Sequence, residues 1–205
     1  WVDGASFMPR DFLLRVPAGR LPLGGGRALH FPDLAIGGTS RIALKGANGL
    51  GKSTLVRHLL GQLQVPMEKV VTVPQEISAE DSRALLEAVK ALPNVERGRV
   101  MTTISRLGSR PARLLESALP SPGEVRKLLL ALGIVRGPHL IVMDEPTNHM
   151  DLPGILCLEE ALADCPCAML LVSHDESFLE KITQTDWLLA KDAAGDTRLE
   201  IKTAR

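Results

Sequence analysis

The chain has 205 residues, of which 45% are hydrophobic and 23% are charged, and its 24 basic and 24 acidic side chains give a formal net charge of zero. This composition fits a globular protein with its own core and offers no broad basic surface for nucleic acid. No apolar run approaches the roughly 20 residues that cross a bilayer, and three irregularly spaced cysteines argue against a secreted disulfide framework. We therefore expect a cytoplasmic protein whose cysteines are free thiols. Because the chain opens with Trp1 rather than Met, we also expect it to be part of a longer protein.

The first 63 residues predict short strands, then a loop and a helix. The predicted strands are 12–16, 27–31 and 41–45, and the turns between them are expected around Pro17, Gly19, Pro22 and the run Gly24-Gly25-Gly26. The third strand leads into a glycine-rich loop, after which a helix is expected from residue 53 to residue 63.

In the rest of the chain, the spacing of apolar residues changes twice. After a strand at 70–73, apolar residues between 79 and 119 recur at helical spacing and predict three helices. The apolar faces of these helices are Leu85, Leu86, Val89 and Leu92, then Met101, Ile104 and Leu107, and finally Leu114, Leu115 and Leu119. A fourth helix is expected at 125–132. Strands at 140–143, 168–172, 186–189 and 197–201 then alternate with helices at about 152–163 and 175–182, which predicts an α/β fold with a parallel sheet.

The loop Gly46-Ala47-Asn48-Gly49-Leu50-Gly51-Lys52-Ser53-Thr54 matches G-x-x-x-x-G-K-[ST], a pattern that wraps nucleotide phosphates in backbone N–H groups. Lys52 would neutralise phosphate charge, and Ser53 would offer a hydroxyl to Mg²⁺. A chance glycine-rich turn would lack the preceding strand and the following helix. We expect nucleotide contacts from Asn48, Gly49, Gly51, Lys52, Ser53 and Thr54.

Two carboxylates, Asp144 and Glu145, close the apolar strand at 140–143. A carboxylate at the end of a buried strand is costly without a partner, and a Mg²⁺ ion shared with Ser53 would be one. Glu145 would point elsewhere and could act as the general base for the attacking water. The alternative is an acidic pair that only caps the next turn.

His174 and Gln75 each follow a predicted strand. The carboxyl ends of parallel strands form the edge where ligands bind, so both side chains are candidates for the same site. His174 could contact the γ-phosphate and orient Glu145, and Gln75 could reach the metal or the water. A lone histidine is more often structural than catalytic. Gln75 taken alone would favour neither a structural nor a functional role.

The segment Ser121-Pro122-Gly123-Glu124 precedes the apolar helix and allows two compatible interpretations. Ser121 and Glu124 have the spacing of a capping box, with Pro122 at the first helical position. The same helix N-terminus, with the Ser121 hydroxyl and the Gly123 N–H, could also bind a phosphate.

Taken in order, these segments resemble the motifs of the ABC ATPases, over about residue 27 to the end of the chain. The loop 46–54 resembles Walker A, Gln75 the Q-loop, 121–124 the signature, 140–145 Walker B, and His174 the switch histidine. The resemblance implies a P-loop NTPase fold of ABC type, formed by residues 1–205 as a single domain. Its parts would be an N-terminal antiparallel β subdomain at about 1–45, an α/β core at about 46–77 and 138–205, and a short helical subdomain at about 78–137. The implied ligands are ATP and Mg²⁺, with Ser53, Gln75 and Asp144 holding the metal.

In this family two domains face head to tail, and ATP is clamped between the Walker A loop of one and the signature of the other. The resemblance therefore implies that Ser121, Gly123 and Glu124 serve a partner's nucleotide and that Asp151, in the D-loop, crosses the interface. The partner would be the other half of a tandem or a second copy, and the chain alone would hydrolyse ATP slowly.

Two positions depart from the family's pattern. Pro122 stands where the signature usually has glycine and removes one backbone donor. The aromatic residue that often stacks on adenine has no counterpart in a chain without tyrosine, and Leu23 falls at that position.

The stretch from Asp144 to Pro153 resembles the EPTNHLD sequence of the F subfamily, and so does Val172-Ser173-His174-Asp175. Members of that subfamily carry two such domains and no membrane domain, and many act on the ribosome, some conferring antibiotic resistance. The resemblance suggests one half of such a tandem and favours the second half. The alternatives are the ATPase subunit of a membrane transporter and a regulatory module that binds nucleotide without hydrolysis. A DNA-repair ABC ATPase would carry a long coiled-coil or zinc insertion, which this chain lacks.

Overall fold

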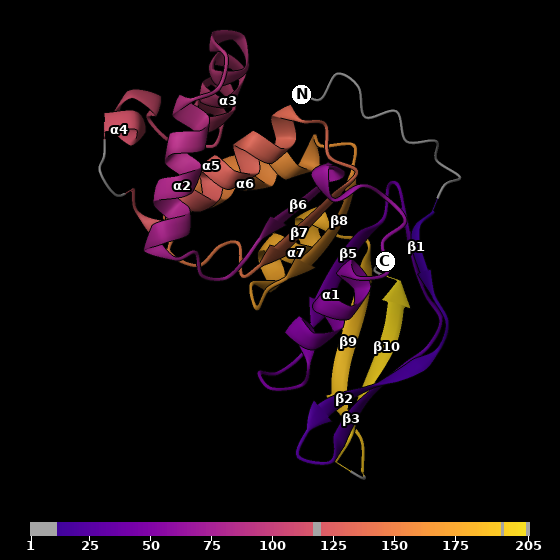
Figure 1. The fold of residues 1–205 in the computed structure, drawn as a ribbon. Coiled ribbons are helices and arrows are strands. Elements are labelled where there is room, and N and C mark those ends of the chain that lie inside the picture. The colour runs from indigo at the N-terminus through magenta and orange to yellow at the C-terminus, as the bar shows by residue number, and fades with distance from the viewer. Residues whose placement is uncertain (1–11, 117–119, 194, 204–205) are drawn as a thin grey trace.

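The computed structural model describes residues 12–116, 120–193 and 195–203. Among these, eight strands form one sheet in the order β2-β3-β10-β9-β5-β8-β7-β6, and β1 pairs with β4 in a separate antiparallel pair (Figure 1). The strands are β1 (Phe12–Val16), β2 (Gly19–Gly24), β3 (Arg27–Phe31), β4 (Leu34–Gly37), β5 (Arg41–Lys45), β6 (Val70–Val73), β7 (Leu140–Asp144), β8 (Ala168–Val172), β9 (Thr185–Lys191) and β10 (Thr197–Thr203). Strands β5 to β8 run parallel, and β9 is parallel to β5.

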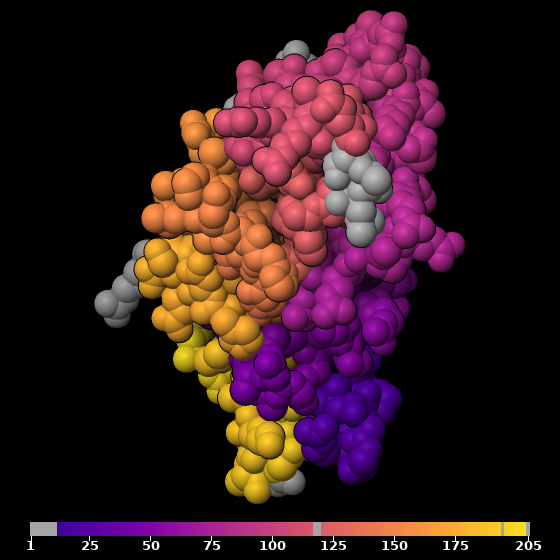
Figure 2. All heavy atoms as spheres, turned by 90° about the vertical axis from the view of Figure 1, so that its left-hand side faces the viewer, coloured from indigo at the N-terminus to yellow at the C-terminus, as the bar shows by residue number. Residues whose placement is uncertain are grey.

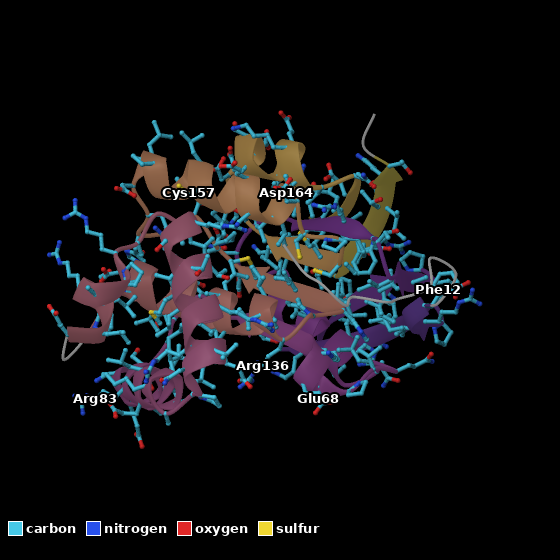
Figure 3. All side chains as sticks on the ribbon, turned by 90° about the horizontal axis from the view of Figure 1, so that it is seen from above. Phe12, Glu68, Arg83, Arg136, Cys157 and Asp164 are labelled. Carbon is cyan, nitrogen blue, oxygen red and sulfur yellow. The ribbon has the colours of Figure 1, made fainter. Side chains whose placement is uncertain are left out.

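The helices are α1 (Lys52–Leu60), α2 (Ala79–Lys90), α3 (Asn94–Arg106), α4 (Pro111–Glu116), α5 (Pro122–Val135), α6 (Leu152–Ala163) and α7 (Glu176–Ile182), with a short 3₁₀ turn, η1, at Met67–Lys69. Helices α2, α3 and α4 gather at one end of the molecule, and the β2–β3 hairpin lies at the other (Figure 1). In the view from above, Arg83 of α2 lies on the opposite side of the molecule from Phe12 of β1 (Figure 3). No helix in the described part of the chain is long and apolar enough to span a membrane.

The side chains of each parallel strand point alternately to the two faces of the sheet, and this divides the hydrophobic core into two clusters. Leu140 and Val142 of β7 face a cluster built with α1 and the N-terminal strands. Ile141 and Met143 face a second cluster built with the helices from α2 onward. Successive side chains of a strand point to opposite faces, so a strand that is apolar throughout must be covered on both. This explains why β7 and β8 have no exposed residue.

The sequence predictions for the α/β segments are confirmed, with a few differences in extent. The helix after the glycine-rich loop ends at Leu60 rather than at residue 63, and α5 extends from Pro122 to Val135. Leu119, expected on the third helix of the middle segment, lies outside the described residues.

The sequence missed β2 and β4. Gly19, Pro22 and Gly24 were interpreted as turn residues, yet β2 is an edge strand, the place where a sheet tolerates proline. The N-terminal strands pair antiparallel as expected, β1 with β4 and β2 with β3. However, β3 also pairs in parallel with β10, so the β2–β3 hairpin extends the main sheet.

The three cysteines are free, as the sequence predicted. Cys165 and Cys167 are buried with their sulfur atoms 3.1 Å apart. The described residues contain no cluster of three or more His, Cys, Asp or Glu side chains that could hold a metal ion.

Candidate active site

A cleft of about 590 Å³ opens where β5, β6, β7 and β8 end. Its lining comes from segments far apart in the sequence and consists of Leu23, Arg27, Asn48, Gly49, Gly51, Lys52, Ser53, Thr54, Gln75, Asp144, Glu145, Asn148 and His174. The carboxyl edge of a parallel sheet is where α/β folds bind ligands. The residues predicted to bind this chain's own nucleotide, metal and water therefore surround one cavity.

Two glycines shape the loop that enters this cleft. Gly46 has φ 145° and Gly51 has φ 97°, values in the left-handed region that L side chains rarely adopt. A Cβ on Gly46 would lie 2.8 Å from the Leu189 carbonyl oxygen, and one on Gly51 would lie 2.5 Å from Cδ2 of Leu23. Gly51 is also the N-cap of α1, so it offers no side chain to the first-turn N–H groups, which leaves them directed at the cleft.

Lys52 is folded onto the loop that precedes it. Its Nζ donates to the carbonyl oxygen of Gly46 at 2.7 Å and lies 3.3 Å from that of Ala47 and 3.4 Å from Asn48 Oδ1. All three acceptors belong to the glycine-rich loop itself. An ammonium group held among oxygens at the N-terminus of a helix is suited to bind an anion.

Asp144 closes β7 and is only partly exposed. Burial raises the pKa of this carboxyl above its usual range, and the negative charge of Glu145 raises it further, whereas Lys52 and Arg126 act in the opposite direction. Asp144 lines the same cleft as the Ser53 hydroxyl and the Gln75 amide, and a Mg²⁺ ion there would stabilise the ionised form of this half-buried carboxyl group. Proteins commonly bind that ion through one or two carboxylates and complete its shell with phosphate and water. Asp144, Ser53 and Gln75 would hold it.

Glu145 begins a strained turn. Its backbone φ is 48°, in the left-handed region, its N–H donates to the Val172 carbonyl at 2.7 Å, and its residue is only 8% exposed. The carboxylate meets His174 twice, since the His174 backbone N–H lies 3.4 Å from Oε2 and the ring Nε2 lies 3.5 Å from Oε1. The same Nε2 is 3.3 Å from Asn48 Oδ1. His174 thus lies between Asn48 of the phosphate loop and the Glu145 carboxylate, and its contact with Glu145 is compatible with the orienting role expected from the sequence.

Arg27 and Asn148 line the cleft, and the sequence did not single them out. Leu23 lines it too, as its alignment position had suggested. Arg27 lies in an N-terminal strand without any motif, so only the pairing of β3 into the main sheet brings it near the loop. Asn148 belongs to the stretch after Glu145 that had carried the subfamily resemblance, which was the available signal.

The signature residues lie outside this cleft. Ser121 and Glu124 form the predicted capping box of α5, with the Ser121 N–H donating to Glu124 Oε2 at 3.0 Å and the Glu124 N–H to Ser121 Oγ at 3.3 Å. Ser121, Gly123 and Glu124 line a separate depression of about 600 Å³. Asp151, the N-cap of α6, lines that depression as well. The structure therefore groups the residues into two sites on one chain.

Comparison with known proteins decides the family. Residues 29–148 match the family described as ABC transporter. The chain belongs to that family. This ABC domain is 35% identical to ATP-binding protein Uup of Caulobacter vibrioides over 161 residues, which are 74% of the chain but only 26% of Uup. It is 31% identical over 181 residues to the zinc import ATP-binding protein ZnuC of Pseudomonas putida, covering 80% of the chain and 70% of ZnuC.

The fold agrees with this assignment. A solved structure of a putative metal-chelate type ABC transporter in an inward-facing conformation superposes with a TM-score of 0.70 at 19% identity, covering 94% of this chain and 84% of that one. The chain is an ATP-binding domain of ABC type with an α/β P-loop fold. It spans about a quarter of the length of Uup and about 70% of ZnuC.

Changing Asp144 to Asn in this ABC domain should stabilise the nucleotide-free protein. The folded-state pKa of Asp144 lies above its unfolded value, so ionisation costs folding free energy. That cost appears as pH rises through the window between the two pKa values, and it persists at neutral pH. We expect Asp144→Asn to raise Tm by roughly 1–4 °C at pH 7 and to weaken Mg²⁺-dependent ATP binding. Differential scanning calorimetry would measure the first, with the exposed Glu180→Gln as the control. A lower Tm would contradict the electrostatic account.

Proposed function

We propose that this ABC domain binds Mg-ATP in the 590 Å³ cleft and hydrolyses it. The observation that carries the proposal is the convergence of Lys52, Asp144, Glu145 and His174 on one cavity at the carboxyl edge of the sheet. A cation, a metal-binding carboxylate and a second, buried carboxylate are the groups that phosphoryl transfer to water requires.

Each group has a separate task in this proposal. The first-turn amides of α1 and the Lys52 ammonium bind the phosphates, and Ser53 and Asp144 hold Mg²⁺, which when bound offsets the charge on the phosphate oxygens. Glu145 accepts a proton from the attacking water, because its carboxylate sits at the cleft wall with His174 beside it at 3.5 Å. Gln75 positions the metal or the water from β6.

The second depression supports a head-to-tail partner. Ser121, Gly123 and Asp151 do not line the chain's own nucleotide cleft, so they are available to a nucleotide held by another ABC domain. That domain would be the other half of a tandem or a second copy. Pro122 contributes no N–H, which leaves the Ser121 hydroxyl and the Gly123 N–H as donors to the phosphate.

We further propose a role of the F-subfamily type, in translation or in ribosome-linked antibiotic resistance. The support is the stretch from Asp144 to Pro153 together with the short helical segment formed by α2, α3 and α4. The second candidate is the ATPase subunit of a membrane transporter, because ZnuC, a zinc import ATP-binding protein, is 31% identical to this chain.

Co-fractionation separates the two roles. The Glu145→Gln variant, expressed in cells at native length, should accumulate with ATP bound and so preserve its partner complex. The F-type role predicts co-sedimentation with ribosomes in a sucrose gradient, in a manner that requires ATP. Recovery in a detergent-solubilised membrane complex, with none on ribosomes, would instead establish the transporter role.

A further inference from the structure

Arg126 is a buried cation on α5 that faces the catalytic segments of its own chain. It is only 2% exposed. Its Nη1 donates to the carbonyl oxygen of Asn148 at 2.7 Å and to that of Glu145 at 3.3 Å, and its Nη2 donates to the carbonyl oxygen of Gln75. One guanidinium group therefore joins the helix that begins with the signature to the ends of β6 and β7.

The turn that Arg126 contacts requires outside support. Glu145 has φ 48° and His149 has φ 63°, and a non-glycine residue in this region costs about 1–3 kcal/mol unless its surroundings hold it there. Within the turn, the Asn148 N–H donates to the Glu145 carbonyl at 3.2 Å and the Met150 N–H to the Thr147 carbonyl at 3.2 Å. Arg126 donates to the carbonyl oxygens of Glu145 and Asn148, which are the two ends of the first hydrogen-bonded segment.

Gly123 brings the helix close enough for these contacts. It lies one turn before Arg126, on the same face of α5. A Cβ at Gly123 would lie 3.0 Å from the His149 carbonyl oxygen, closer than nearly all real contacts. The first turns of α5 thus pack directly on the turn after Glu145. Figure 2 shows the salmon residues that follow the grey gap beside the orange residues that follow β7.

Stability alone does not account for a charge at this position. Burial lowers the pKa of Arg126, although the charges of Asp144, Glu145 and Glu76 act to raise it. Among the described residues its hydrogen bonds go to carbonyl oxygens and it forms no ion pair with a carboxylate. A buried ion is often no more stabilising than a well-packed apolar side chain, whereas it fixes geometry through directed hydrogen bonds.

We propose that Arg126 is a positioning residue for ATP hydrolysis, which holds the backbone of Glu145 and Gln75 at a fixed separation across the cleft. The inference rests on the proposed function. Because Arg126 touches neither the phosphate loop nor Lys52 by hydrogen bonding, its loss should affect turnover more than nucleotide binding. Because Ser121 caps α5, the same contact would connect a partner's nucleotide bound at Ser121 to this chain's own Glu145.

The test compares Arg126→Gln with Arg41→Gln. Arg41 is a matched control, since its guanidinium also donates to three carbonyl oxygens, those of Leu162, Ala163 and Cys165, at the opposite end of β5 from the cleft. We expect Arg126→Gln to lower kcat at least tenfold with the Kd for Mg-ATP within threefold of the unsubstituted chain. In the nucleotide-free protein, hydrogen exchange of the Asn148 and Met150 amides should become at least tenfold faster. Arg41→Gln should change neither kcat nor these two amides.

A smaller loss of kcat, a loss confined to Kd, or an equal loss in Arg41→Gln would overturn the inference. If Arg126→Gln does not fold, Arg126→Lys takes its place. It keeps the charge but has one nitrogen for three carbonyls, so kcat should fall at least threefold at unchanged Kd, and unchanged kcat would overturn the inference. If the unsubstituted chain does not bind Mg-ATP at all, the proposed function itself fails, which the binding titration reveals before any variant is made.

Discussion

Replacing Glu145 with Gln is expected to lower kcat for ATP about 100-fold or more while leaving Mg-ATP bound. A positioned general base typically contributes 10²- to 10⁴-fold to a rate, and an amide cannot accept the proton. Glutamine keeps the shape of the side chain and can still accept the His174 N–H, which lies 3.4 Å from Oε2. The substitution should therefore remove the proton acceptor without opening the cleft.

Single-turnover hydrolysis of radiolabelled ATP would measure the rate, and light scattering would report whether the trapped complex pairs. Glu159→Gln is the matched control, because Glu159 is a largely buried carboxylate that pairs with Lys181 at 2.7 Å outside the cleft. It should leave kcat unchanged. A rate for Glu145→Gln within threefold of the unsubstituted chain would show that another group accepts the proton.

Replacing Lys52 with Met is expected to weaken Mg-ATP binding about 100-fold or more. Truncating one member of a desolvated, hydrogen-bonded charge pair costs about 2–5 kcal/mol, and each 1.4 kcal/mol is a factor of ten. The carbonyl oxygens of Gly46 and Ala47 hold the ammonium group against the loop that is proposed to bind the phosphates.

Fluorescence titration with a labelled ATP analogue would measure this loss. Lys181→Met removes an exposed lysine whose partner is Glu159, outside the cleft, and should leave the Kd unchanged. An equal Kd for Lys52→Met and the unsubstituted chain would mean that the phosphates bind elsewhere.

Much of the site could be predicted from sequence because its residues follow strands. The loop that leads to Lys52 comes directly after a predicted strand, Asp144 and His174 follow two others, and the carboxyl ends of such parallel strands meet at one edge. The capping box at Ser121 and Glu124 was equally visible, since it depends only on a spacing of three residues.

What the sequence did not reveal depends on tertiary pairing. Arg27 reaches the cleft only because β3 pairs with β10, and no local pattern encodes that contact. Most residues around Arg126 in α5 are buried, so the helix has no clear polar face on which a charged residue would be expected. The sequence alone therefore does not distinguish Arg126 from an exposed arginine, and only its contact with the turn after Glu145 shows that it is buried. The edge strand β2 was hidden by its glycines and proline, which are typical of turns as well.

The central claim is that this chain binds Mg-ATP through the loop at 46–54 and the carboxyl edge of its sheet. Isothermal titration of the chain with ATP, in the presence of Mg²⁺ and again in EDTA, tests it most directly. The account predicts one nucleotide per chain, with an affinity that falls when Mg²⁺ is removed and falls about 100-fold or more in Lys52→Met. No heat of binding from a folded chain at millimolar Mg-ATP would contradict it.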